Sequence, residues 1–160
     1  MSKLTLTLFG PPAITLNNQS LHVGRRKAVA LLAYLAVTGR RCSRRALGNL
    51  LWPAYDERAA LAEVRRALST LKQKLGNEWL AADRQDIALL PSADLWIDVL
   101  AFRQAVALCR HDQTPGPLAL LTEAADLAQA DFLAGFAVPD APDFEQWQLF
   151  EGQALRQELA

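Results

Sequence analysis

The 160-residue chain has few cysteines and no long hydrophobic run. Cys42 and Cys109 are its two cysteines, and their wide separation gives no sign of the disulfide framework that stabilises small secreted domains. The longest continuous apolar stretch, residues 28–37, is too short to cross a bilayer. Residues 1–4 lead into an alternating pattern and not into the apolar core of a signal peptide. We therefore expect a cytoplasmic protein that does not enter a membrane.

The sequence also lacks the patterns of common enzymes and metal sites. It contains no glycine-rich phosphate loop and no nucleophile elbow. Its two histidines are His22 and His111, and no second Cys/His cluster joins His111 and Cys109 to complete a metal site. We predict that the protein is not an enzyme, and we assign it no catalytic residue, no metal ligand and no cofactor.

A net charge is absent overall, but the two halves of the chain are oppositely charged. Seventeen Lys and Arg residues balance seventeen Asp and Glu residues. Residues 1–75 hold thirteen basic and three acidic side chains, whereas residues 76–160 hold four basic and fourteen acidic ones. A strongly basic block attracts polyanions such as duplex DNA. A basic surface that only keeps the protein soluble is the alternative explanation.

The N-terminal part shows the pattern of a small antiparallel sheet. Leu4, Leu6 and Leu8 alternate with polar residues, which predicts a half-buried strand. We predict a second strand over 13–16 and, after a turn at 17–20, a third over 21–23.

Three helices and a hairpin follow the predicted sheet. The first helix begins after residue 24 and ends at Gly39, and Ser43 is placed to cap a second helix that Pro53 stops. Asp56 is placed to cap a third, long helix over 57–75, with Gly76 as its stop. Short strands over 79–82 and 87–90 then form a hairpin. The second and third helices with this hairpin predict a winged helix-turn-helix.

From residue 94 onward the spacing predicts helices alone. They cover the region from residue 99 to 109, the region from 118 to 128 after a turn at 114–117, and the region from 144 to the last residue. The last helix has no stop signal, so we expect a longer protein to continue beyond it. We expect two domains, 1–92 and 93–160, and an α+β fold. The core of the second should include Trp96, Phe132, Phe136, Phe144 and Trp147.

The long helix over 57–75 has two different faces. At 100° per residue its leucines and Val64 fall in one apolar stripe, which predicts the packed side. The opposite side is polar and cationic, and its side chains are of the kinds that bond to base edges in the major groove. We predict base-reading roles for Arg66, Ser69, Thr70 and Gln73. An ordinary solvated helix face is the alternative.

Further cations flank this helix and the two before it. Cations at a helix start oppose the helix dipole, so fold stability does not explain them, whereas a bound phosphate would. Solubility alone is the alternative for each of them. The predicted phosphate contacts are Arg25, Arg26, Lys27, Arg41, Arg44, Arg45, Arg65, Lys72, Lys74 and Arg84.

Several of these segments together resemble a known family. The stretches 8–12, 24–28, 31–35, 44–53 and 64–72 are similar to the OmpR-type winged helix of the Streptomyces antibiotic regulatory protein (SARP) class. The stretches 95–98, 131–136 and 144–147, with Phe102, resemble the bacterial transcriptional activator domain, a tetratricopeptide-like all-α unit. The similarity covers nearly the whole chain. It depends on the order and spacing of the motifs, because no single motif is unique to the family.

The resemblance implies a transcription factor that binds repeated promoter elements in double-stranded DNA and contacts RNA polymerase. The fourteen acidic residues of the second half favour homodimerisation, docking on a basic protein surface or packing against the basic half. A solvated acidic scaffold is the alternative. Glu63, Thr70 and the hairpin residues 86–89 depart from the family pattern. These departures support an alternative function, a protein-interaction module whose winged helix no longer binds DNA.

Overall fold

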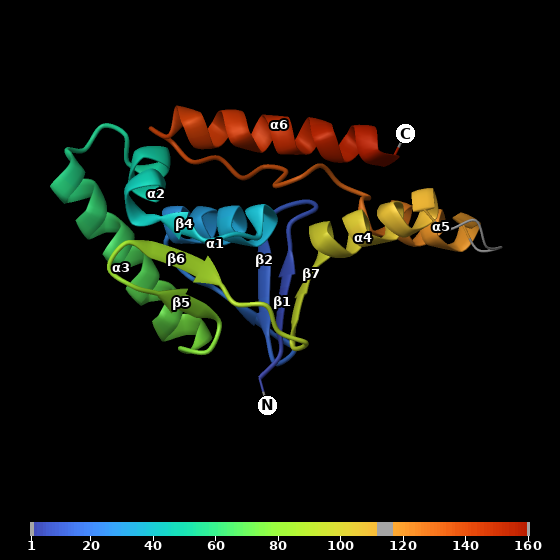
Figure 1. Ribbon diagram of the computed structural model, residues 1–160, viewed down its shortest axis with the longest axis horizontal. Coiled ribbons are helices and arrows are strands. Elements are labelled where there is room, and N and C mark those ends of the chain that lie inside the picture. Colours follow the sequence, from blue (N-terminus) through green and yellow to red (C-terminus); the bar gives the residue numbers. More distant parts are fainter. Residues whose placement is uncertain (1, 112–116, 160) are drawn as a thin grey trace.

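The computed structural model describes residues 2–111 and 117–159 and has the α+β fold that the sequence predicts. Its long helix and a hairpin lie together at one end, a small sheet lies in the middle, and two further helices lie at the other end (Figure 1). The helices are α1 (Arg26–Thr38), α2 (Arg44–Leu51), α3 (Glu57–Leu75), α4 (Asp98–His111), α5 (Pro117–Leu127) and α6 (Pro142–Leu159).

The strands form two small sheets with the orders β3-β2-β1-β7 and β4-β6-β5. Every pairing is antiparallel except that of β1 with β7, which is parallel. The hairpin β5–β6 follows α3 and is the predicted wing. The strands are β1 (Leu4–Thr7), β2 (Ala13–Leu16), β3 (Gln19–Leu21), β4 (Cys42–Ser43), β5 (Leu80–Ala82), β6 (Asp86–Leu89) and β7 (Leu95–Ile97).

The third strand begins earlier than predicted. We expected a turn over 17–20 and a strand over 21–23, but Gln19 already pairs with Leu16. The turn therefore consists of Asn17 and Asn18 alone, with φ angles of 54° and 66°. Two left-handed residues in succession give the tight hairpin turn whose twist matches the strands, and asparagine tolerates that conformation better than most residues.

Strand β7 corrects the prediction that residues from 94 onward are only helical. Leu95 to Ile97 run parallel to β1, with Leu4 opposite Leu95 and Leu6 opposite Ile97. Trp96, which we expected in the core, is 38% exposed because it alternates with the buried Ile97 on this strand. The other expected core aromatics are inside or half inside: Phe132 and Phe144 are buried, and Phe136 and Trp147 are partly buried.

The predicted helix caps are confirmed. The Ser43 side chain accepts a hydrogen bond from the N–H of Ala46 at 3.0 Å, and the Asp56 side chain accepts one from Ala59 at 2.8 Å. Gly39 ends α1 in the left-handed conformation, with φ 66°. Each cap satisfies backbone groups that the helix itself leaves unpaired. The predicted turn at 114–117 lies almost wholly outside the described residues, and Pro117 begins α5.

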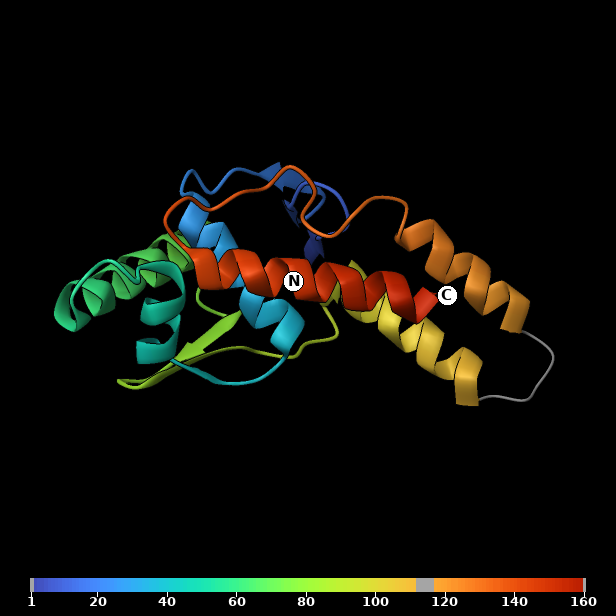
Figure 2. The same ribbon diagram turned by 90° about the horizontal axis from the view of Figure 1, so that it is seen from above.

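Helix α6 joins the winged helix to helices α4 and α5. It packs against α2 at one end and against α4 and α5 at the other, and Figure 2 shows it running across the middle of the molecule, over α1. The ring of Trp147 on α6 meets that of Tyr34 on α1 at a centroid distance of 4.8 Å. Arg103 of α4 binds Glu151 at 2.7 Å and Glu158 at 3.3 Å, both on α6. Among the described residues no helix is long and apolar enough to span a bilayer.

Candidate nucleic-acid interface

Helix α3 presents its polar side to solvent, as its sequence predicts. Its buried residues are Ala60, Val64, Ala67, Leu68, Leu71 and Leu75. Of the predicted base-reading residues, Arg66, Ser69 and Gln73 are exposed and Thr70 is half-buried. No packed layer of the described protein covers this side (Figure 1). A ligand as large as a duplex can therefore reach it.

A shallow depression on this side brings several predicted contacts together at the start of α2 and along α3. Its lining residues are Arg44, Arg65, Leu68, Ser69, Lys72, Gln73 and Asn77. The Nε of Arg44 is buried and has no hydrogen-bond partner among the described residues. Neither Arg44, Arg65 nor Lys72 forms an ion pair with a carboxylate in the described part of the chain. An anion at this depression would meet three cations, Arg44, Arg65 and Lys72.

Glu63 holds two of the predicted DNA contacts beside this depression. Its carboxylate binds Arg25 of the α1 start at 3.3 Å, and it also binds Arg66 one turn along α3. The Glu63 side chain is 16% exposed, whereas that of Arg66 is 61% exposed. The hydroxyl of Thr70 donates to the carbonyl of Arg66 at 3.0 Å, so its hydrogen is used within the helix. In the free protein Arg66 is thus held by an anion.

Two further predicted phosphate contacts pair with acidic residues. Arg41 lies 3.4 Å from Asp83 and Arg45 lies 3.2 Å from Glu57, measured between side-chain nitrogen and oxygen atoms. All four side chains are more than half exposed. Ion pairs this exposed contribute little to stability, so a phosphate can replace the carboxylate at small cost.

The remaining predicted contacts are spread more widely. Lys27 lies over the Trp52 ring, 5.4 Å from its centroid, which is a cation–π contact. Arg26 lines a different cavity, next to Phe136. Lys74 is exposed near the end of α3, and Arg84 is exposed at the tip of the β5–β6 hairpin. The fold therefore gathers Arg44, Arg65, Ser69, Lys72 and Gln73 at one depression and leaves the rest around it or apart.

Asp83 orders the hairpin tip, and Gln85 fastens the tip to the start of α2. One Asp83 carboxylate oxygen accepts hydrogen bonds from the N–H groups of Gln85 and Asp86, at 2.8 and 2.7 Å. These backbone bonds, and then the charges of Arg41 and Arg44, hold the pKa of Asp83 below its usual value. The N–H of Arg44 also donates to the carbonyl of Gln85 at 2.7 Å. The hairpin tip is thus ordered and close to the cations.

Sequence reasoning missed three contributors to this surface. Asn77 lies beyond the end of α3, and no local pattern links it to Arg44. The bond between Glu63 and Arg25 joins residues far apart in sequence, so only the fold brings them together. The role of Asp83 could have been predicted from the sequence, because an aspartate in a turn often accepts hydrogen bonds from backbone N–H groups two or three residues later.

Nothing in the described part of the chain suggests a metal centre, since it holds no group of three His, Cys, Asp or Glu side chains that could bind an ion. No protein-family model and no curated protein sequence matches the chain. A solved structure of Mycobacterium tuberculosis EmbR, in complex with a low affinity phosphopeptide, is similar to it with a TM-score of 0.75 and 20% sequence identity. The similarity covers 99% of this chain and 44% of the EmbR chain, so this chain spans less than half the length of EmbR. At this identity the likeness shows the fold.

Proposed function

We propose that this protein is a sequence-specific regulator of transcription that binds double-stranded DNA, with α3 in the major groove. The observation that carries the proposal is the depression where Arg44, Arg65 and Lys72 meet without carboxylate partners among the described residues. The EmbR-like fold and the sequence resemblance to the SARP class support the same function.

The arrangement of α3 suits a major groove. The helix has 19 residues and is one of the outermost elements at its end of the molecule, with the β5–β6 hairpin beside it (Figure 1). The major groove of B-DNA is about 12 Å wide and admits one helix. With α3 in the groove, Arg66, Ser69 and Gln73 would face base edges, and the hairpin tip with Arg84 would face the sugar-phosphate backbone.

The depression supports the phosphate contacts in this proposal. Arg44 of α2 and Lys72 of α3 both line it, so a phosphate there would be bound by two elements at once. Phosphate contacts fix the register of the protein on the duplex, and base contacts then read the sequence. The exposed cations Lys74, Arg41 and Arg45 would add long-range attraction.

Arg66 reaches a base only by leaving Glu63. A guanine offers the guanidinium two acceptors, O6 and N7, in place of one carboxylate. At a DNA site without guanine at that position, Arg66 stays paired with Glu63 and contributes no binding energy. The Glu63–Arg66 pair therefore sharpens discrimination, because the exchange is favourable only at the right base.

The other parts of this proposal derive from the resemblance. We propose that the DNA sites are repeated promoter elements, that the protein acts in the cytoplasm, and that it contacts RNA polymerase or a second copy of itself. The acidic part of the chain, which includes α4, α5 and α6, lies away from α3 over most of its length and would carry those protein contacts (Figure 1).

Selection of duplexes from a random library, followed by a salt titration of the selected site and of an unrelated duplex, tests the proposal. We expect enrichment of a defined sequence and an affinity that falls steeply as salt rises, because counterions are released on binding. Equal weak binding to every duplex would contradict sequence reading.

One observation favours a second function, a protein-interaction module. Glu63 places an anion on α3 next to the proposed base-reading side chains, and it binds both Arg25 and Arg66. If α3 docks an acidic protein surface and not DNA, the selection should yield no enriched sequence. Binding to the unrelated duplex should then also be absent at physiological salt.

A further inference from the structure

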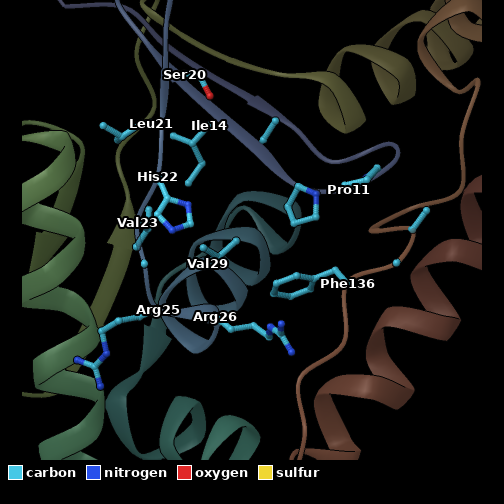
Figure 3. A pocket seen from close by; sticks show the side chains of 15 residues that line it. Pro11, Ile14, Ser20, Leu21, His22, Val23, Arg25, Arg26, Val29 and Phe136 are labelled. Atoms are coloured by element: carbon cyan, nitrogen blue, oxygen red, sulfur yellow. The ribbon is translucent and has the colours of Figure 1, made fainter.

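A cavity of about 560 Å³ lies on the side of the winged helix that faces the loop before α6. Figure 3 shows its walls, formed by the β2–β3 side of the sheet, the first turn of α1 and the loop around Phe136. This volume is within the usual range for small-molecule sites. The cavity therefore has room for a compact organic ligand.

The walls of the cavity combine apolar side chains with a histidine and a cation. Ile14, Val23, Val29 and Phe136 supply apolar surface, and the His22 ring points into the same space (Figure 3). Arg26 extends from the start of α1 toward Phe136. Arg26 has no ion-pair partner within the part of the chain that the structure describes. The cavity thus has apolar walls and a cationic side chain at its rim.

The Phe136 wall is held in place from both sides. The N–H of Phe136 donates to the carbonyl of Leu133 at 3.0 Å, and the side chain of Gln148 on α6 donates to the carbonyl of Phe136, also at 3.0 Å. Leu133 in turn donates to the carbonyl of Leu8 at 2.8 Å. These bonds fasten the Phe136 loop to α6 and to the end of β1, so little ordering of this wall would oppose binding.

The two neighbouring arginines at the start of α1 point in different directions. Arg25 extends toward α3, where it binds Glu63, whereas Arg26 lies on the Phe136 side (Figure 3). Arg26 was predicted as a DNA phosphate contact, yet it does not share the depression of Arg44 and Lys72. Its position lets it contact a ligand in the cavity beside Phe136.

We propose that this cavity binds a small amphipathic anion, with a carboxylate or phosphate head on Arg26 and a ring or short aliphatic body against Phe136 and Val29. A guanidinium can donate two parallel hydrogen bonds to either head group. The apolar walls then exclude water from the ligand body. A cationic ligand is disfavoured because Arg26 repels it, and a neutral one forgoes the charge-assisted bonds.

Calorimetric titration of the full chain with phenyl phosphate, benzoate, benzamide and benzylamine tests this site. We expect saturable binding of phenyl phosphate and benzoate, and at least tenfold weaker binding of the neutral benzamide and the cationic benzylamine. Nuclear magnetic resonance should show shifts at His22 and Phe136 on adding phenyl phosphate. No saturable binding of either anion at millimolar concentration, or equal affinity for benzamide, would overturn the proposal.

The variant Arg26→Gln tests the assigned residue. Arg26 is exposed, so we expect the variant to keep the wild-type Tm and to lose about tenfold in affinity for phenyl phosphate. Arg156→Gln is the matched control, since it removes an equally exposed arginine from α6 and should leave the affinity unchanged. Wild-type affinity for phenyl phosphate in Arg26→Gln would refute the assignment, whether or not the protein binds DNA.

Discussion

The carboxylate of Asp98 accepts a bifurcated hydrogen bond from the backbone N–H of Leu8, whose nitrogen lies 2.8 and 2.9 Å from the two carboxylate oxygens. The N–H groups of Phe9 and Val99 also donate to it, at 3.0 and 2.8 Å. Asp98 is 3% exposed and is the first residue of α4, whereas Leu8 follows β1. This buried carboxylate therefore joins the first helix after the winged part to the central sheet.

Replacing Asp98 should weaken the whole fold. In Asp98→Ala the N–H groups of Leu8 and Phe9 lose their acceptor in a buried place, and we expect the free energy of unfolding to fall by about 3 kcal/mol. Urea denaturation followed by circular dichroism measures it. Asp126→Ala, at an exposed site on α5, is the control and should change stability by less than about 0.5 kcal/mol. Equal stability of the two variants would mean that the Asp98 hydrogen bonds make no net contribution to the free energy of unfolding.

The same residue should give stability a specific pH dependence. Burial raises the pKa of Asp98 above its usual 3.8 and outweighs the hydrogen bonds that lower it. An acid with a higher pKa in the folded state binds more protons there, so its contribution to stability falls as pH rises through that interval. We expect the stability of wild type relative to Asp98→Asn to decrease as pH rises above about 3.8 and then to level off. Denaturation at a series of pH values checks this, and an increasing difference would show a lowered pKa.

Arg66→Ala should relax the sequence preference of the protein. If Arg66 exchanges Glu63 for a guanine, its loss weakens binding to the selected site by about 1–3 kcal/mol and removes discrimination at one base position. Competition binding with duplexes that differ at single positions measures both effects. Equal losses on the selected site and on random duplex would assign Arg66 to a phosphate.

Arg44→Ala should weaken binding to all duplexes alike. Removal of one phosphate contact lowers the slope of log affinity against log salt by about one. Arg156→Ala is the matched control, because its side chain is 61% exposed at the far end of α6 and the slope should not change. A wild-type slope in Arg44→Ala would place the DNA away from the depression.

Glu63→Gln should tighten non-specific DNA binding. The substitution frees Arg25 and Arg66 and removes an anion from the DNA side of α3, and we expect affinity for random duplex at low salt to rise about fivefold. Fluorescence anisotropy measures it. Glu123→Gln, at an exposed site on α5, controls for the change in net charge and should have little effect. Lower affinity in Glu63→Gln would mean that Glu63 positions Arg66 for DNA.

The elements that sequence analysis predicted well are those with local signals. Helix α3 carries its own start and stop at Asp56 and Gly76, and its apolar spacing continues over about four turns. The polar side of the same helix was predicted to be exposed, and this is confirmed for Arg66, Ser69 and Gln73, whereas Thr70 is half-buried. Its DNA contacts remain predictions until binding is measured.

The elements that were missed depend on distant partners. Strand β7 has three residues, too few to show a period of two, and it is a strand because β1 lies beside it. Strand β4 has two residues and is defined by its pairing with β6. The Asn17–Asn18 turn was recognisable locally, but the four-residue polar stretch hid which two residues form it.

The rings of Trp147 and Tyr34 have a mechanical consequence. Trp147 also contacts Phe132 and Phe144, so a packed aromatic cluster, and not a flexible linker, connects α6 to α1. Close-packed interiors shift as units and do not stretch. A partner that displaces α6 therefore also displaces α1, and with it the α2–α3 pair that packs on α1.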